Sequence, residues 1–236
     1  MIEIIPAIDI IDGKCVRLTQ GDFLKKKVYN EDPLSVAKTF EQAGLRRLHL
    51  VDLDGAKQGH IVNIDMLEKI CTNTSLTVDF GGGIKTDEDV RTAFSAGAAM
   101  ITAGSIAVKN KNLVAKWFAK WGAEKIILGA DVSDKTIATH GWQENSGINI
   151  YEFYESFFLT NFKYSICTDI SKDGMLKGPS IELYKEILDK FPEMRLIASG
   201  GVSSLEDIRK LEAIGVYGVI IGKAIYENKI NIRDLV

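Results

Sequence analysis

A segment in the first half of this chain recurs in the second half. Residues 82–107 align without a gap over residues 200–225, and seven of the aligned positions are identical. Each copy has the pattern of a Gly-rich loop, an amphipathic helix, a short apolar strand and a second Gly-bearing turn. A repeat spaced by half the chain predicts a two-fold pseudo-symmetric fold, and paired Gly loops predict two similar anion sites. The repeat therefore points to a ligand with two phosphate groups.

Short apolar runs alternate with longer helical patterns along the whole chain. The runs are rich in Ile, Val and Leu with little alternation, which is typical of parallel strands buried on both faces. Three of the helical patterns end at Gly44, Gly97 and Gly215, because glycine tolerates the positive φ of a helix C-terminus. The expected strands are 3–8, 48–53, 76–80, 100–103, 126–130, 165–168, 195–198 and 218–221.

These patterns predict an α/β protein that forms a single (β/α)8 TIM barrel with two-fold half-barrel pseudo-symmetry. The length of 236 residues is near the ~250 residues typical of such barrels, and no linker divides the chain. We expect one domain over residues 1–236, with half-barrels of about 1–122 and 123–236. An open, doubly wound sheet is the alternative, and the half-chain repeat favours the closed barrel.

The composition excludes several other classes of protein. A net charge of −3 argues against nucleic-acid binding, and no apolar run approaches the ~18 residues that span a membrane. Three cysteines without a CxxC motif indicate reduced thiols, and the three histidines lack metal-ligand spacing. The N-terminal residues have the pattern of a first strand and not of a signal peptide. We therefore expect a cytoplasmic protein without a metal site, and we expect a monomer.

Two aspartates lie where the catalytic groups of a barrel are found, at the carboxyl ends of strands. Asp9 closes the first expected strand and Asp131 the fifth. Strands one and five are opposite in a ring of eight, so these carboxylates would face each other across the mouth. Two facing carboxylates can act as general acid and general base if their surroundings separate their pKa values. A turn or a helix cap is the alternative role for each aspartate taken alone.

Candidate phosphate-binding loops follow the third, fourth, seventh and eighth strands, on the diameter perpendicular to the two carboxylates. Backbone N–H groups at glycine can approach phosphate oxygens closely, and a following helix N-terminus adds a favourable dipole. A long substrate could thus anchor a phosphate at each end, with its reacting middle between the carboxylates. The candidates are Gly82, Gly83, Gly104 and Ser105 in one half and Gly200, Gly201, Gly222 and Lys223 in the other.

Three segments rich in Gly and polar residues follow the first, fifth and sixth strands. We expect residues 19–29, 136–147 and 171–178 to be loops that are mobile without ligand and close over it. Trp142 lies in the second of these segments, where its indole could stack on a flat heterocycle. The alternative is an indole that only packs on the barrel rim.

Motifs distributed over the whole chain carry a resemblance to a known family. They include PAIDIIDGKCVRLTQGD at 6–22, VDFGGGIKT at 78–86, TDISKDGMLKGPS at 168–180 and GVIIGKAIY at 218–226. Together they resemble the phosphoribosylformimino-aminoimidazole-carboxamide ribotide isomerase family of histidine biosynthesis. The resemblance implies a (β/α)8 barrel derived from half-barrel duplication. It also implies an Amadori rearrangement, in which a bisphosphorylated aminoaldose ribotide becomes an aminoketose without metal or organic cofactor.

The resemblance also implies roles for the carboxylates. Asp9 matches the family's proton acceptor, and Asp131 matches its proton donor. The acid assists ring opening to an imine, and the base then takes the C2 proton to give an enol amine that becomes the ketone. Asp173, in the SKDGM segment, is a rival for the acid, and the sequence does not decide between the two.

Further positions match residues that bind or support the substrate in this family. Thr168 matches a catalytic position on the sixth strand, and Asp169 supports the site next to it. Arg17 and Gln20 match substrate-clamping positions, and a guanidinium can bind phosphate through two hydrogen bonds. Gly178 is a further substrate-binding candidate. Departures from the family pattern are confined to the sixth loop, at Lys172, Met175 and Ser180.

Three alternatives to an isomerase with one substrate remain open at the level of sequence. The cyclase subunit of imidazole-glycerol phosphate synthase shares the half-barrel symmetry, but it typically begins CLDVKDGRVVKG, whereas residues 17–22 here follow the isomerase. A bifunctional relative would also isomerise phosphoribosylanthranilate. A non-catalytic phosphate-binding barrel would be expected to lose one aspartate of the pair, and both Asp9 and Asp131 are present.

Overall fold

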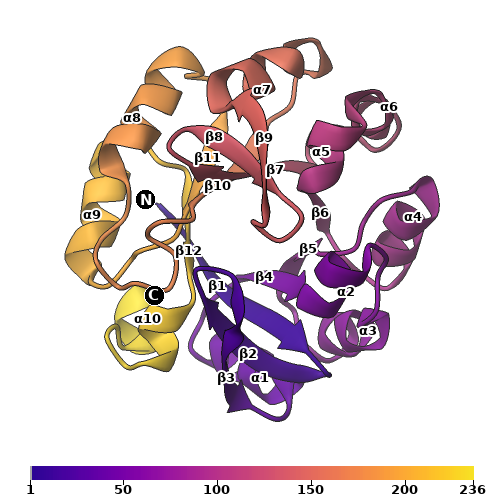
Figure 1. Ribbon diagram of the computed structural model, residues 1–236. Coiled ribbons are helices and arrows are strands. Elements are labelled where there is room, and N and C mark those ends of the chain that lie inside the picture. Colours follow the sequence, from indigo (N-terminus) through magenta and orange to yellow (C-terminus); the bar gives the residue numbers. More distant parts are fainter. Residues whose placement is uncertain (1) are drawn as a thin grey trace.

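The structure, a computed structural model, describes residues 2–236 and contains a closed parallel β-barrel surrounded by helices (Figure 1). Parallel pairing runs continuously around the ring, and the last barrel strand pairs with the first from Glu3↔Gly218 to Pro6↔Ile221. The predicted (β/α)8 barrel is confirmed, and the open sheet is excluded because the ring closes. The barrel strands are β1 (Glu3–Ile11), β4 (Arg47–Asp52), β5 (Thr77–Gly81), β6 (Met100–Ala103), β7 (Ile126–Ser133), β10 (Tyr164–Asp169), β11 (Arg195–Ser199) and β12 (Gly218–Ile221).

The helices lie outside the barrel between successive strands (Figure 1). They are α1 (Pro33–Gln42), α2 (Leu53–Gln58), α3 (Ile64–Asn73), α4 (Asp87–Ser95), α5 (Ser105–Lys109), α6 (Lys111–Trp121), α7 (Ile150–Ser156), α8 (Ile181–Lys190), α9 (Leu205–Ala213) and α10 (Lys223–Tyr226), with 3-10 turns η1 (Phe158–Thr160) and η2 (Ile232–Leu235). No helix within residues 2–236 is both long enough and apolar enough to span a membrane.

Apolar side chains fill the lower part of the barrel and leave its upper rim to polar ones. Ile5 and Ala7 share the inward face of β1 with Asp9, because side chains two residues apart along a strand point the same way. Ile166 likewise lies below Thr168 on β10. This packed layer closes the floor of the barrel, so any ligand is confined to the carboxyl ends of the strands.

Two β-hairpins rise from opposite sides of the ring, where the sequence predicted loops. The first contains β2 (Lys14–Thr19) and β3 (Asp22–Asn30), and the second contains β8 (Thr136–Thr139) and β9 (Glu144–Asn149). They lie at the bottom and the top of the view in Figure 1. The loop expectation was therefore wrong for residues 19–29 and 136–147. Cross-strand hydrogen bonds to β1 and β7 make each segment an extension of the sheet.

The structure also corrects some element boundaries. The strand expected at 48–53 ends at Asp52, because Leu53 begins the short helix α2, whose first turn is capped by the Asp52 side chain at Gly55 N. The strand expected at 76–80 is Thr77–Gly81. Helix α3 was missed, and it supplies Leu67 and Ile70 to the core. The helices that were expected to end at Gly44, Gly97 and Gly215 do so, and each glycine has φ between 87° and 100°.

The glycines of the repeat have a physical cause in the packing of the backbone. Gly82 and Gly200 have φ of 95° and 96°. A Cβ on Gly82 would lie 2.1 Å from the carbonyl oxygen of Asp52, and one on Gly200 would lie 2.9 Å from that of Asp169. Asp52 and Asp169 end the neighbouring strands β4 and β10. Each half-barrel thus uses the same close approach between two loops, as the pseudo-symmetry predicts.

Candidate active site

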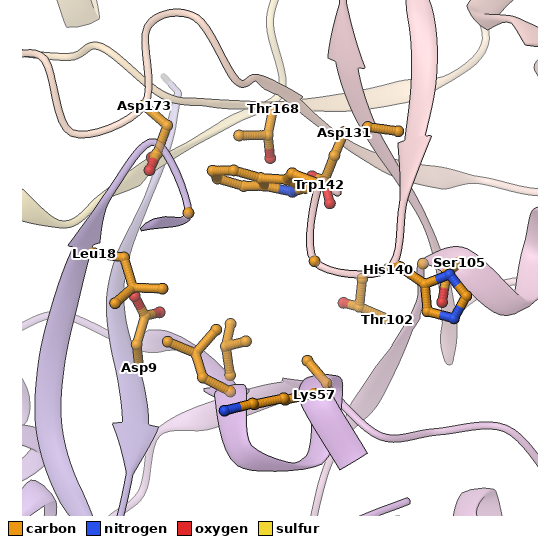
Figure 2. Close-up of a pocket in the computed structure, with 18 of the residues that line it drawn as sticks. Asp9, Leu18, Lys57, Thr102, Ser105, Asp131, His140, Trp142, Thr168 and Asp173 are labelled. Carbon is orange, nitrogen blue, oxygen red and sulfur yellow. The ribbon is translucent and has the colours of Figure 1, made fainter. Parts of the chain in front are cut away.

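A cavity of about 280 Å³ opens at the carboxyl ends of the barrel strands. Figure 2 shows Asp9 and Asp131 on opposite sides of it, with Asp173 and Thr168 along the edge between them. The predicted residues that line it are Asp9, Arg17, Gly82, Gly83, Gly104, Ser105, Asp131, Trp142, Thr168 and Asp173. Those that line a smaller adjoining cavity of about 20 Å³ are Arg17, Asp173, Gly200, Gly201, Gly222 and Lys223.

Asp9 forms an ion pair with Arg17, which reaches it from the neighbouring strand β2. Arg17 Nη1 lies 2.9 Å from Asp9 Oδ2, and the two side chains are only 11% and 13% exposed. Burial raises the pKa of Asp9, while the charges of Arg17 and His49 oppose that rise. Gly222 leaves room for this arrangement, because a Cβ there would lie 2.4 Å from the Arg17 guanidinium carbon. The guanidinium thus positions a carboxylate at the edge of the cavity.

Asp131 is held by two hydrogen-bond donors on the opposite side. The side chains of Trp142 and Thr168 both donate to its carboxylate, and Figure 2 shows the indole nitrogen directed toward it. Burial raises the pKa of Asp131, and these two hydrogen bonds act in the opposite direction. Donors to the charged form stabilise a carboxylate, so Asp131 is better supported as an anion than burial alone would allow.

Asp173 lies on the loop between β10 and α8 and completes a group of three carboxyls. Burial raises its pKa to about 6; Arg17 opposes the rise, and the negative charges of Asp9 and Asp131 reinforce it. Of the three carboxyls, Asp173 is therefore the one whose surroundings most favour retention of a proton near neutral pH.

Two lysines, Lys85 and Lys109, lie near the Gly104–Ser105 turn, and the sequence analysis did not single them out. Lys85 donates to the Ser105 hydroxyl, and Lys109 Nζ lies 2.8 Å from His140 Nε2. Burial lowers the pKa of Lys85, and the neighbouring charge of Lys109 lowers it further. The signal that could have found Lys85 is its place in the GGGIK segment, directly after the repeated glycines. This end of the cavity is suited to an anion.

The corresponding end in the second half is closed by the chain itself. Lys223 Nζ donates to the carbonyl oxygen of Gly174 at 2.8 Å and lies 3.3 Å from Thr19 Oγ1. Gly174 belongs to the β10–α8 loop, and a Cβ on it would lie 3.1 Å from the Leu18 carbonyl oxygen. The ammonium of Lys223 is therefore already hydrogen-bonded to the β10–α8 loop in this structure.

Three other predicted residues lie outside both cavities. Gln20 donates through Nε2 to the carbonyl oxygen of Ser171 at 3.3 Å, and Asp169 accepts from the Ser171 N–H at 2.9 Å. Gly178 donates its N–H to the Gly201 carbonyl oxygen at 2.9 Å. In this structure these residues shape the β10–α8 loop, and their predicted contact with a substrate stays a prediction.

The histidines lie apart from one another and have partners of other kinds. His49 contacts Asp79, and His140 contacts Glu144. Within residues 2–236, no group of three or more His, Cys, Asp or Glu side chains is arranged so that it could hold a metal ion.

Comparisons with known proteins agree with the geometry. A family model described as "Histidine biosynthesis protein" matches residues 3–231. A protein of Parabacteroides distasonis is 59% identical over 235 residues, covering 100% of this chain and 98% of its own. A protein of Bacteroides thetaiotaomicron is 60% identical with the same coverage, and one of Flavobacterium johnsoniae is 55% identical over 233 residues, covering 99% and 97%. All three are named 1-(5-phosphoribosyl)-5-((5-phosphoribosylamino)methylideneamino)imidazole-4-carboxamide isomerase.

The match covers both half-barrels and every strand that contributes to the cavity. Identity of this degree over the full length includes the loops as well as the barrel framework. The chain belongs to the histidine biosynthesis protein family.

Proposed function

We propose that this protein is the isomerase that converts the aminoaldose 1-(5-phosphoribosyl)-5-((5-phosphoribosylamino)methylideneamino)imidazole-4-carboxamide into its aminoketose. Relatives that are 55–60% identical over nearly the whole chain have this name. The observation that carries the proposal is the group of three carboxyls at the mouth of the barrel. Lys85 lies at one end of this group and Lys223 at the other, so each end has a cation that suits a phosphate. These relatives support neither the cyclase nor the phosphoribosylanthranilate alternative.

A substrate with two phosphoribosyl groups suits a site with two cationic ends. One phosphate would bind at Gly104–Ser105 with Lys85 and Lys109, and the other near Gly201 and Lys223. Binding of the second would displace the Gly174 carbonyl oxygen from Lys223 and so move the β10–α8 loop. The ribose that reacts would then lie between the carboxyls on the perpendicular diameter.

Asp173 is the best-suited general acid for opening the ribose ring. Its pKa of about 6 keeps a substantial protonated fraction near neutral pH, and it lies on the loop that phosphate binding at Lys223 would move. It would donate its proton to the ring oxygen as the C1–O bond breaks and the imine forms. Asp131, whose carboxylate accepts hydrogen bonds from Trp142 and Thr168, would instead stabilise the cationic imine as an anion.

Asp9 is the general base in this scheme. Its ion pair with Arg17 favours the ionised form that a base requires. The Asp9 carboxylate would take the C2 proton, and the electrons of the C2–H bond would form the C1–C2 double bond of the enol amine. The enol amine then becomes the ketone by moving a proton from the C2 hydroxyl to C1. One proton leaves Asp173 and one arrives at Asp9, so the substrate keeps its composition.

Only proton transfers are required, so we propose that the reaction uses neither metal nor cofactor. The two hairpins would exclude water from the ring-opened imine, which water would otherwise hydrolyse. The Trp142 indole lies between the hairpins, since a Cβ on Gly21 would come within 2.5 Å of it. We further propose that the protein acts as a cytoplasmic monomer.

The proposal is tested by incubating the pure protein with the aminoaldose ribotide and following the absorbance change, with the product identified by NMR. We expect conversion to the aminoketose, and we expect a sample of Asp9→Asn prepared in the same way to show almost none. A second reaction contains the aminoketose and ammonia. Consumption of the aminoketose in that reaction, without interconversion of the two ribotides, would overturn the proposal in favour of the cyclase.

A further inference from the structure

A histidine paired with a buried aspartate lies beneath the site and has no part in the proton transfers proposed above. His49 on β4 and Asp79 on β5 are partners in the parallel ladder, and His49 Nδ1 lies 2.5 Å from Asp79 Oδ1. The Asp79 side chain is fully buried, whereas His49 is 13% exposed and lines the cavity. Asp79 is therefore enclosed in the barrel wall, while His49 contacts the cavity.

The surroundings of Asp79 require a positive charge close by. Its Oδ2 has no hydrogen-bond partner within the described chain and lies 3.8 Å from Arg47, whose guanidinium is also paired with Glu3 at 2.9 Å. Thr102 donates to Oδ1 from β6. A buried carboxylate without full compensation is costly, so its closest partner, the His49 ring, is favoured in the charged form. Both ring nitrogens then carry protons.

His49 is the ladder partner of Ala7, which shares the inward face of β1 with Asp9, and both His49 and Asp9 line the cavity. A charge on His49 therefore acts on the carboxylates above it. Burial opposes protonation of the ring, but Asp79, through charge and hydrogen bond, and then Asp9 outweigh it, so the pKa of His49 is raised. In turn, the His49 charge lowers the pKa of both Asp9 and Asp131. The other charged group that faces His49 is Arg17, which opposes its protonation.

We propose that His49 and Asp79 are positioning residues of the isomerase: Asp79 holds the His49 ring charged and fixed, and this cation keeps Asp9 ionised as the base. The inference rests on the proposed function and adds a residue pair that acts through Asp9 without touching the reacting atoms. Arg17 is the second cation on Asp9, but the β2–β3 hairpin carries it. The His49 charge instead belongs to the barrel wall, so it stays in place whatever the hairpin does.

The first test uses ¹⁵N NMR of the histidine rings in the whole protein. His60→Gln and His140→Gln assign the His49 signals, since the chain has three histidines. We expect both His49 nitrogens to be protonated at pH 7.5 in the wild type and only one in Asp79→Asn. A wild-type ring that is neutral at this pH would overturn the proposal, and this measurement does not depend on isomerase activity.

The second test follows Asp9 itself, by its ¹³C carboxyl titration and by the acidic limb of kcat/KM against pH. Loss of the cation raises the pKa of the base, so Asp79→Asn should move both upward by about one pH unit. A purely structural pair would lower the Tm and leave both titrations in place, which contradicts the proposal. A shifted ¹³C titration of Asp9 in a protein without isomerase activity would instead refute the proposed function, while the effect of the His49–Asp79 pair on Asp9 would remain supported.

Discussion

The two half-barrels have the same loop geometry and different electrostatics. Gly82 and Gly200 share their φ and their close approach to the preceding loop. The second glycine turn of each half differs, because a Cβ on Gly104 would meet nothing within 4 Å, whereas one on Gly222 would lie 2.4 Å from the Arg17 guanidinium carbon. In the first half, Lys85 and Lys109 flank the open Gly104 turn. In the second half, the β10–α8 loop and Lys223 are bound to each other. The repeated backbone thus provides two equivalent loops. We expect the open loop to bind a phosphate directly and the loop at Lys223 to bind one only after the β10–α8 loop has moved.

Removal of the general base Asp9 should reduce turnover more than any other change, because no residue of either half-barrel takes over its role. Asp9→Asn should reduce kcat by at least ~10²-fold while substrate binding is kept, the usual scale for a lost acid or base. Steady-state kinetics and a ligand titration measure the two effects. Asp12→Asn, in the exposed turn after β1, is the matched control. Turnover near that of the wild type would remove Asp9 from the mechanism.

Comparison of Asp131→Asn with Asp173→Asn distinguishes a general acid on the barrel strand β7 from one on the β10–α8 loop. We expect the larger loss of kcat in Asp173→Asn, because its proton goes to the ring oxygen. The wild-type kcat/KM should also decrease as pH rises past about 6, the pKa of Asp173, and this alkaline limb should be absent from the variant. A larger kcat loss in Asp131→Asn would return the acid role to Asp131.

The Asp173 carboxyl should lower the free energy of unfolding at neutral pH. The pKa of Asp173 is raised to about 6 by burial, so its contribution to stability is present below about pH 4 and is lost as pH rises through 6. Two pKa units correspond to about 3 kcal/mol. Asp173→Asn should therefore be more stable than the wild type by up to this amount at pH 8 and by little at pH 4. Urea unfolding at both pH values measures the difference, with the exposed Asp189→Asn as control; a difference that is equal at pH 4 and pH 8 contradicts the prediction.

Substitution of Trp142 tests whether the indole between the two hairpins contributes to substrate binding. Trp142→Ala should weaken substrate binding by ~1–3 kcal/mol, the scale of base–aromatic stacking. Trp142→Phe keeps a ring for stacking but removes the donor to Asp131, so it should retain most of the affinity while still raising the pKa of Asp131. Titration with a substrate analogue compares the variants. Normal binding and turnover by the alanine variant would mean that the indole only packs on the rim.

The sequence predicted the barrel well because its signals are local and repeated. Apolar runs and terminal glycines located all eight barrel strands, and the half-chain repeat predicted closure. The hairpins were missed because their polar strands lack alternation. The turn that leads from β1 into the first hairpin had a signal, since Asp12–Gly13 is a dipeptide that favours a two-residue turn between antiparallel strands, and both residues have positive φ.

The candidate site was predicted in its outline but not in its asymmetry. The positions of Asp9 and Asp131 follow from strand order alone, so the sequence could place them opposite each other. The hydrogen bond from Lys223 to Gly174 and the pairing of His49 with Asp79 depend on loop conformation and strand register. No spacing along the chain reports either of them. The sequence therefore could not tell which half binds an anion freely.

We expect one substrate to bridge both half-barrels. A crystal structure of Asp9→Asn with the aminoaldose ribotide tests it most directly, because the variant should bind the substrate without converting it. We predict one phosphate at Gly104–Ser105 and the other near Gly201 and Lys223, with the reacting ribose between residue 9 and Asp131. Both phosphates on the same side of the barrel, or a Lys223 still bound to Gly174 with the ligand in place, would contradict the account.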